Sequence, residues 1–198
     1  MSAGFKYDLV PPVEQEERYD VQTGVRRRGP YKLDKTNLIE GTILPDFTPV
    51  CADLKNKIAT VVVNLTVFEA YTNATSAKTI KVAKNSLAYV GMFLGNGANG
   101  AEVTAIDKTN KEYDVLTIKA SFGADLAKGT VLFNAAAVDG LKQKFVANSA
   151  LYGRTKVEEG ITLISLLRSA AEIEPSKLVM PFSSNDKANM KGWFDFNE

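Results

Sequence analysis

The chain has 198 residues and a mass of 21.5 kDa, enough for one or two domains with a hydrophobic core. It contains 24 basic and 23 acidic residues, no histidine and one cysteine. A net charge of +1 gives no overall field that would select nucleic acid or an anionic membrane, so we expect neither partner. The absence of histidine excludes the usual Ser-His catalytic pairs and most zinc sites. The composition therefore favours a protein that is not an enzyme and needs no metal or other cofactor.

The sequence predicts no secretion signal and no membrane span. The first ten residues lack the apolar core of a secretion signal, and no stretch approaches the ~18 apolar residues of a membrane span. With 45% hydrophobic and 24% charged residues, the chain has an ordinary globular composition. We therefore expect a soluble binding or structural module in which Cys51 is a small buried side chain.

The first 40 residues differ from the rest. They contain the pair Pro11-Pro12, an acidic run over residues 14–17 and the sequence Gly29-Pro30, and no strand or helix period persists there. We predict an extended N-terminal arm over residues 1–40, followed by a β-rich domain over residues 41–198. The alternative is a tail that packs on its own domain or is flexible.

The arm contains spaced aromatic residues and a triplet of arginines, which could bind in grooves on another protein. We predict that the following residues attach the chain to a partner: Phe5, Tyr7, Tyr19, Arg26, Arg27, Arg28 and Tyr31. Specific nucleic-acid binding by three arginines is a weaker interpretation, because acidic residues lie nearby in the sequence.

From residue 41 onward the pattern is typical of β-structure. Residues 58–68 are rich in β-branched side chains and predict one long central strand, and residues 78–83 alternate in the same way. The core is expected to contain Val61, Val63, Leu65, Val67, Ile80, Val82, Val115 and Ile118.

A hairpin is the clearest element of the middle region. Residues 101–106 and 113–119 alternate between apolar and polar side chains on either side of a polar turn, and residues 91–94 and 130–133 predict shorter strands. The glycine-rich residues 95–100 precede a strand rather than a helix, so they predict a tight turn and not a phosphate-binding loop. Asp107, Glu112 and Asp114 lie in or beside the hairpin turn, where acidic residues are common, and are weak candidates for catalysis.

The C-terminal region combines three features. Residues 161–173 fit both a helix and a buried strand, and we favour the strand because the surrounding sequence is β-rich. Residues 184–191 have the capping residues and following glycine of a short helix. The aromatic tail is either a last strand or an exposed anchor, and we predict that Trp193, Phe194 and Phe196 contact another subunit or a neighbouring protein.

The stretch from residue 78 to residue 133 resembles the capsid-decoration or head-fibre proteins of tailed bacteriophages, including those of crAss-like phages. The segments on which the resemblance rests are 79–86, 90–94, 103–107, 113–118 and 122–133. The later segments 151–153 and 161–175 look like the final strands of that family. The density of short alternating strands between turns predicts an all-β fold, mainly antiparallel and either a β-barrel or a sandwich, with an extended N-terminal arm and a short C-terminal helix.

The same resemblance implies a structural virion protein on the outside of a phage head. It would assemble in the host cytoplasm, bind the major capsid protein and associate with itself as a dimer or trimer. The aromatic residues and arginines of the N-terminal arm predict that the arm makes the contact with the capsid protein. The alternative is a carbohydrate-binding β module without enzymatic activity, in which Trp193, Phe194 and Tyr113 would stack on sugar rings.

Overall fold

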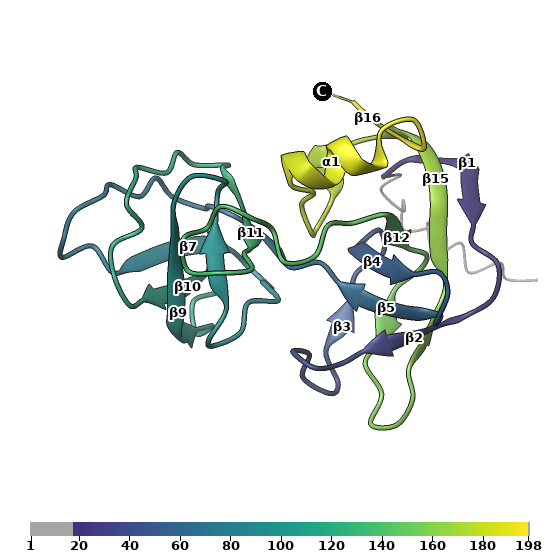
Figure 1. The fold of residues 1–198 in the computed structure, drawn as a ribbon, viewed down its shortest axis with the longest axis horizontal. Coiled ribbons are helices and arrows are strands. Elements are labelled where there is room, and N and C mark those ends of the chain that lie inside the picture. Colours follow the sequence, from purple (N-terminus) through teal and green to yellow (C-terminus); the bar gives the residue numbers. More distant parts are fainter. Residues whose placement is uncertain (1–17, 198) are drawn as a thin grey trace, which may run out of the picture.

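The computed structural model describes residues 18–197, which form two β-rich lobes joined side by side (Figure 1). The terminal lobe contains both ends of the described chain, and the central lobe comprises residues 64–144. The terminal lobe contains β1 (Asp20–Arg26), β2 (Tyr31–Asp34), β3 (Ile43–Leu44), β4 (Pro49–Asp53), β5 (Ile58–Val61), β12 (Ser149–Leu151), β13 (Thr155–Lys156), β14 (Leu163–Ile164), β15 (Leu166–Ile173) and β16 (Phe194–Phe196). The central lobe contains β6 (Asn64–Thr66), β7 (Thr79–Ala83), β8 (Phe93–Gly95), β9 (Gly100–Asp107), β10 (Tyr113–Ile118) and β11 (Val131–Asn134).

Each lobe is a curled sheet. In the central lobe the strand order is β6-β11-β8-β9-β10-β7, and a bridge between Val67 and Val82 joins the two outer strands. In the terminal lobe the order is β1-β15-β12-β4-β5-β2-β14, and only Ser165 separates β14 from β15. Because β14 continues into β15, the strands from β15 to β14 form a ring. All pairs are antiparallel except β2 with β5 and β15 with β16, which confirms the predicted all-β, mainly antiparallel fold.

The predicted long strand over residues 58–68 divides between the lobes. Its first half is β5, which pairs with β4 and β2, and its second half is β6, which pairs with β11. Val62 and Val63 lie at the crossing, where the Val62 N–H donates to the Pro49 carbonyl oxygen and the Val63 carbonyl oxygen accepts from the Asn134 N–H. The β-branched run is therefore extended as predicted, but it links two sheets.

One continuous hydrophobic cluster extends from the terminal lobe into the central lobe. Seven of the eight predicted core residues are buried: Val61, Val63, Leu65, Val67, Ile80, Val82 and Ile118. The prediction is wrong for Val115, which is only half-buried. Since alternate residues of a strand face opposite sides, Val115 cannot share a face with Leu116 and Ile118, which are fully buried.

The predicted C-terminal strand and helix are both present. Residues 163–173 form β14 and β15, with no helix, and a 3₁₀ turn (η1, Pro175–Lys177) follows. Helix α1 (Ser184–Met190) begins with a capping box: the Ser183 Oγ accepts from the Asp186 N–H at 3.1 Å, and Asp186 Oδ2 accepts from the Ser183 N–H at 3.0 Å. This helix covers a second hydrophobic cluster on the outer face of the terminal lobe.

The Asp186 carboxylate also joins the two lobes. It accepts hydrogen bonds from Asn64 Nδ2 at 2.7 Å, Gln143 Nε2 at 2.9 Å and the Ala147 N–H at 2.7 Å. Asn64 begins β6, and residues 143–147 lead the chain back to the terminal lobe, so one fully buried side chain fixes both crossings.

The glycine-rich residues 95–100 form the predicted turn and also a tight contact. Asn96 Oδ1 accepts from the N–H groups of Ala98 and Asn99 at 3.0 and 2.8 Å, and Gly97 has a φ of +93°. Gly140, with a φ of +70°, lies against this turn so closely that a Cβ there would overlap the Asn99 carbonyl oxygen. The turn therefore packs backbone against backbone within the central lobe.

Candidate attachment surfaces

The structure corrects the predicted arm. Residues 20–34 form β1 and β2, so the chain is already part of the terminal lobe well before residue 40. Pro30 directly precedes β2, a position that a sheet tolerates, and β2 pairs with β5 and β14. Tyr31 and Leu33 alternate with Lys32 and Asp34 as a strand requires, but this four-residue pattern is too short to be distinguished from the irregular sequence around it.

Two of the predicted aromatic anchors are buried in this lobe. Tyr31 is 1% exposed in the main hydrophobic cluster, and Tyr19 packs against Phe47 with ring centroids 4.9 Å apart. Burial, followed by the nearby charge of Asp46, raises the pKa of Tyr19. These side chains stabilise the fold and are not available to a partner. Phe5 and Tyr7 lie outside the described residues.

The arginine triplet is at the surface, where β1 ends beside β15. Arg26 and Arg28 are exposed, and the Arg26 guanidinium lies 5.0 Å from the centre of the Tyr152 ring. Arg27 is more enclosed: its Nε donates to Ser149 Oγ at 2.7 Å and its NH2 group donates to the Asn148 carbonyl oxygen at 2.8 Å. Burial lowers the pKa of Arg27, and the positive charge of Arg168 lowers it further, against an opposing effect of Tyr31.

The three tail aromatics separate into two groups. Phe194 is buried in the second hydrophobic cluster, and Phe196 packs on Phe182 with centroids 5.1 Å apart, because β16 pairs with β15. Phe194 is therefore enclosed in its own lobe, whereas Phe196 stays partly exposed, and contact of the tail with another protein stays a prediction. Trp193 is 58% exposed and lies under the Arg168 guanidinium, 5.1 Å from its Cζ.

The predicted arginines and Trp193 thus lie on neighbouring strands. We define the arginine edge as Arg26, Arg27, Arg28, Arg168 and Trp193, on or beside β1, β15 and β16 (Figure 1). Within residues 18–197, none of its four guanidinium groups has a carboxylate within ion-pair distance. An uncompensated group of arginines next to an exposed tryptophan is suited to bind an acidic protein surface.

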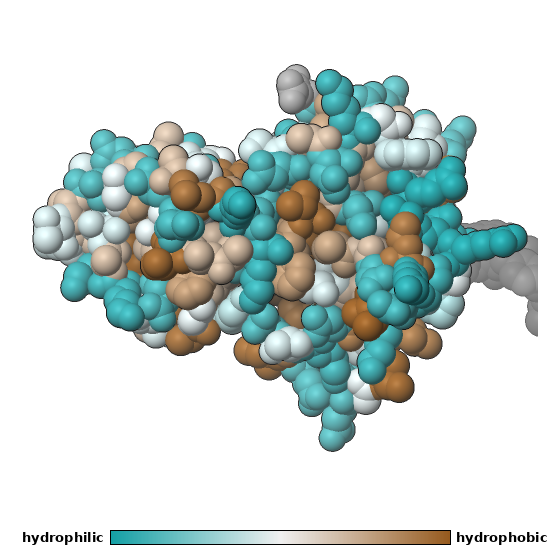
Figure 2. Space-filling view, in the orientation of Figure 1, coloured by the Kyte–Doolittle hydropathy of each residue, from teal (hydrophilic) through white to brown (hydrophobic). Residues whose placement is uncertain are grey.

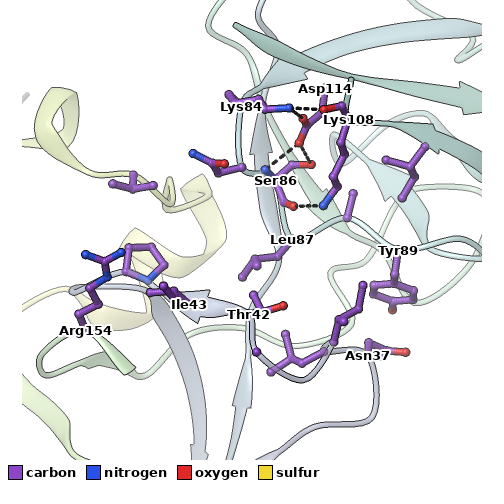
Figure 3. Close-up of a pocket in the computed structure, with 18 of the residues that line it drawn as sticks. Asn37, Thr42, Ile43, Lys84, Ser86, Leu87, Tyr89, Lys108, Asp114 and Arg154 are labelled. Carbon is purple, nitrogen blue, oxygen red and sulfur yellow. Dashed lines mark hydrogen bonds and ion pairs between the residues drawn. The ribbon is translucent and has the colours of Figure 1, made fainter. Parts of the chain in front are cut away.

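A second candidate surface is a cleft of about 890 Å³ between the lobes. The terminal lobe contributes residues 37–46 together with Arg154 and Val179, and the central lobe contributes residues 84–90 and Ile106. Figure 3 shows Ile43 and Arg154 in the cleft lining together with Leu87. Hydrophobic side chains also interrupt the hydrophilic surface near the junction of the lobes (Figure 2).

A polar network holds one wall of this cleft in place (Figure 3). The buried Asp114 carboxylate pairs with Lys84 Nζ at 2.9 Å and accepts from the N–H and Oγ of Ser86 at 3.0 and 2.8 Å. Lys108 Nζ donates to the Ser86 carbonyl oxygen at 2.8 Å. Burial raises the pKa of Asp114, but the hydrogen bonds from Lys84 and Ser86 outweigh it and the net pKa is lowered. The network therefore clamps residues 84–86 to the hairpin β9–β10.

The weak catalytic candidates Asp107 and Glu112 lie in or beside the loop of the hairpin β9–β10. Asp107 Oδ1 accepts from the Thr109 N–H at 2.9 Å in the hairpin turn, and this bond lowers the pKa of Asp107. Glu112 is exposed in the same loop. Tyr113, a candidate for sugar stacking, packs on Phe68 in the central lobe, whereas Trp193 lies in the terminal lobe. The structure therefore does not bring the proposed stacking residues together.

Sequence reasoning missed the cleft, Arg168 and Asp186. The cleft forms only when residues from both lobes meet, and Arg168 is a single arginine in an apolar strand. Asp186 had one detectable signal, because Ser183 and Asp186 have the spacing of a capping box.

Among residues 18–197, no three His, Cys, Asp or Glu side chains are grouped to hold a metal ion. No helix in that part of the chain is long and apolar enough to cross a membrane. Cys51 is half-buried, and burial raises the pKa of its thiol.

The fold and these surfaces define an all-β protein whose candidate sites are surfaces for binding other molecules. Residues 1–194 match the family model described as head fiber protein. The chain therefore belongs to the phage head fibre protein family and is a structural protein associated with the phage head. No curated protein and no solved structure matches it.

Proposed function

We propose that this protein decorates the outside of the phage head and binds the major capsid protein through its N-terminal residues and the arginine edge. It assembles onto the head in the host cytoplasm as a homo-oligomer. The observation on which the proposal rests is the arginine edge, where four guanidinium groups lie together without an ion-pair partner among residues 18–197.

The described chain starts on the strands of the arginine edge, at the end of β1 opposite to Arg26. The Arg18 carbonyl oxygen accepts from the Glu174 N–H at 3.0 Å, just after the end of β15. Residues 1–17 therefore join the fold beside β1 and β15, the strands of the arginine edge. A partner surface that binds this edge is within direct reach of Phe5 and Tyr7.

The N-terminal residues and the arginine edge differ in how much ordering they need when they bind a partner. Ordering an extended segment costs roughly 1–2 kcal/mol per residue in backbone entropy, which anchors such as Phe5 and Tyr7 must offset on the partner. The arginines of the folded lobe need less ordering, since Arg27 and Arg168 are already held by hydrogen bonds or by an aromatic ring. Trp193, exposed beside them, is the remaining candidate for contact with another copy or with the capsid protein.

The test is binding to heads assembled without this protein. The double variant Arg26→Glu, Arg28→Glu should lose at least about tenfold in affinity, because both charges face the acidic partner. A matched control, Lys78→Glu with Lys111→Glu, makes the same change in net charge at exposed positions of the central lobe and should change affinity by less than about twofold. Equal losses in the two variants, or no loss in the arginine variant, would exclude the arginine edge as the attachment site.

The N-terminal residues need a separate variant of the full chain. Phe5→Ser with Tyr7→Ser removes both anchors, so bound copies per head should fall sharply while circular dichroism stays unchanged. Undiminished occupancy would show that the folded lobes alone make the attachment.

A further inference from the structure

The cleft between the lobes has an uncovered apolar lining. Ile39 is 78% exposed and Val90 is 62% exposed, and Ile43 and Val179 in the same lining are also exposed. These side chains come from both lobes, so they surround one cavity. Exposed apolar side chains gathered around a cavity mark a binding site for an apolar segment.

The charges around the lining are mainly positive. The cleft is lined by four basic residues, Arg18, Lys84, Lys108 and Arg154, and by two acidic ones, Asp46 and Asp114. Both acidic groups are already paired, Asp46 with Arg18 at 3.8 Å and Asp114 with Lys84. Arg154 has no carboxylate within ion-pair distance in the part of the chain that the structure describes. The cleft is therefore suited to a segment that combines apolar and acidic side chains.

Residues 1–17 have this composition. They contain the apolar side chains of Phe5, Tyr7, Leu9, Val10 and Val13, and four acidic residues against one lysine. The acidic side chains are Asp8, Glu14, Glu16 and Glu17.

The segment also begins at the cleft. Arg18, the residue that follows it, is itself part of the lining. Seventeen residues span up to roughly 60 Å when extended, so reach within the same chain is not limiting. A tethered segment acts at an effective concentration that a free partner rarely matches.

We propose that, in the free protein, residues 1–17 dock in the cleft of their own chain. Their aromatic and aliphatic side chains cover Ile39, Ile43, Val90 and Val179, and an acidic side chain pairs with Arg154. The cleft then keeps the attachment segment covered until the protein meets a head, where the capsid protein competes for it. Only this last step rests on the proposed function; the docking itself does not.

The experiment uses the full chain with isotope-labelled Ile, Leu and Val methyl groups, in the absence of capsid. In the variant Phe5→Ser, Tyr7→Ser, Leu9→Ser, the methyl signals of Ile39, Ile43 and Val90 should shift. Ile161 is the internal control, since it is 70% exposed on the terminal lobe and does not line the cleft. Unchanged cleft signals, or equal shifts at Ile161, would overturn the proposal.

A spin label distinguishes docking within one chain from exchange between copies. In a chain with Cys51→Ser and Ala3→Cys, a nitroxide at position 3 should broaden the cleft methyl signals. An equal mixture of isotope-labelled chains without the nitroxide and spin-labelled chains without isotopes should show no broadening. Broadening in the mixture would assign the segment to a neighbouring copy and contradict docking within the chain. Val90→Asp should abolish the broadening, whereas Ile161→Asp should leave it intact.

Because no head is present, these outcomes are independent of attachment. If the cleft signals do not respond but the Phe5 and Tyr7 variant still fails to bind heads, the proposed function stands and the docking is wrong. If the cleft signals respond but head binding is unaffected, the docking stands and the N-terminal residues are not the attachment segment.

Discussion

The two lobes are both curled antiparallel sheets, yet they differ in the residues that face outward. Every arginine of the chain lies outside residues 64–144, whereas the central lobe has lysine as its only basic residue. The terminal lobe also contains the helix, the exposed Trp193 and the point where residues 1–17 join the fold. The arginines and the exposed tryptophan therefore lie on one lobe, and the other lobe lies beside it (Figure 1).

The lobes are nevertheless coupled. The central lobe is inserted between β5 and β12 of the terminal lobe, and one hydrophobic cluster continues through both. Asp186 fixes both crossings. The comparison thus predicts separate roles for the two surfaces but a single unfolding unit, and the following variants test each part.

The largest effect is expected for Asp186→Ala. It removes the acceptor of several buried donors, among them Asn64 Nδ2, Gln143 Nε2 and the Ala147 N–H, and should cost roughly 3–5 kcal/mol of unfolding free energy. Chemical denaturation measures it, with the exposed Asp195→Ala as control. A loss below about 1 kcal/mol would mean that the carboxylate does not hold the lobes together.

Core deletions in each lobe test the coupling. Leu116→Ala in the central lobe and Leu151→Ala in the terminal lobe each empty a fully buried site and should cost about 2–5 kcal/mol. Both should move one common transition, monitored by Trp193 fluorescence and by circular dichroism. If Leu116→Ala produces a separate early transition that Trp193 does not report, the lobes unfold independently.

Gly140→Ala should destabilise the central lobe by about 1–3 kcal/mol, because the new methyl group overlaps the Asn99 carbonyl oxygen. Gly97→Ala is the matched control: it also has positive φ, but nothing lies within 4 Å of its added methyl group. Thermal unfolding should show a larger loss for Gly140→Ala. Equal losses would attribute the whole effect to backbone strain rather than to the contact.

The network of Asp114 with Lys84 and Ser86 at the cleft predicts that the free energy of unfolding depends on pH. Because the folded state lowers the pKa of Asp114, its contribution to stability is complete above the unfolded pKa of about 3.9 and is lost as the pH falls through the folded value. Asp114→Asn should therefore be less stable than the natural chain at pH 7, with a smaller difference near pH 2. Denaturation at both values checks this, and a difference that grows on acidification would contradict the sign.

The smallest effect on stability is expected at the arginine edge. Trp193→Ala removes an exposed ring whose contact with Arg168 is worth about 0.5–1 kcal/mol. Phe194→Ala, one residue later, deletes a buried ring and should cost about 3–5 kcal/mol. Similar losses in the two variants would show that Trp193 belongs to the fold and is not reserved for a partner.

The sequence alone was sufficient for the elements whose signals are local. The hairpin β9–β10, strand β7 and helix α1 follow from alternation or capping within about ten residues. The division into lobes was not predictable in this way, because residues 58–68 form one apolar run that pairs with different strands on either side of Val62. Strand β2 was missed because its alternating pattern covers only the four residues 31–34, directly after Gly29-Pro30.

The attachment residues were predicted by type but not by burial. The arginines at 26–28 are at the surface, whereas Tyr19 and Tyr31 are buried. Tyrosine occurs both in hydrophobic cores and at binding sites, so its presence in the sequence does not show whether it is exposed. In the tail, strand alternation placed Phe194 and Phe196 against the lobe and left Trp193 outside. Only the three-dimensional packing separates these cases.

The most direct test of the account is a cryo-electron microscopy map of heads with the protein bound. We predict that the terminal lobe, with the arginine edge and the start of the chain, contacts the major capsid protein, and that the central lobe, residues 64–144, lies farther from the shell. A map in which the central lobe contacts the shell and the arginine edge points outward would contradict it.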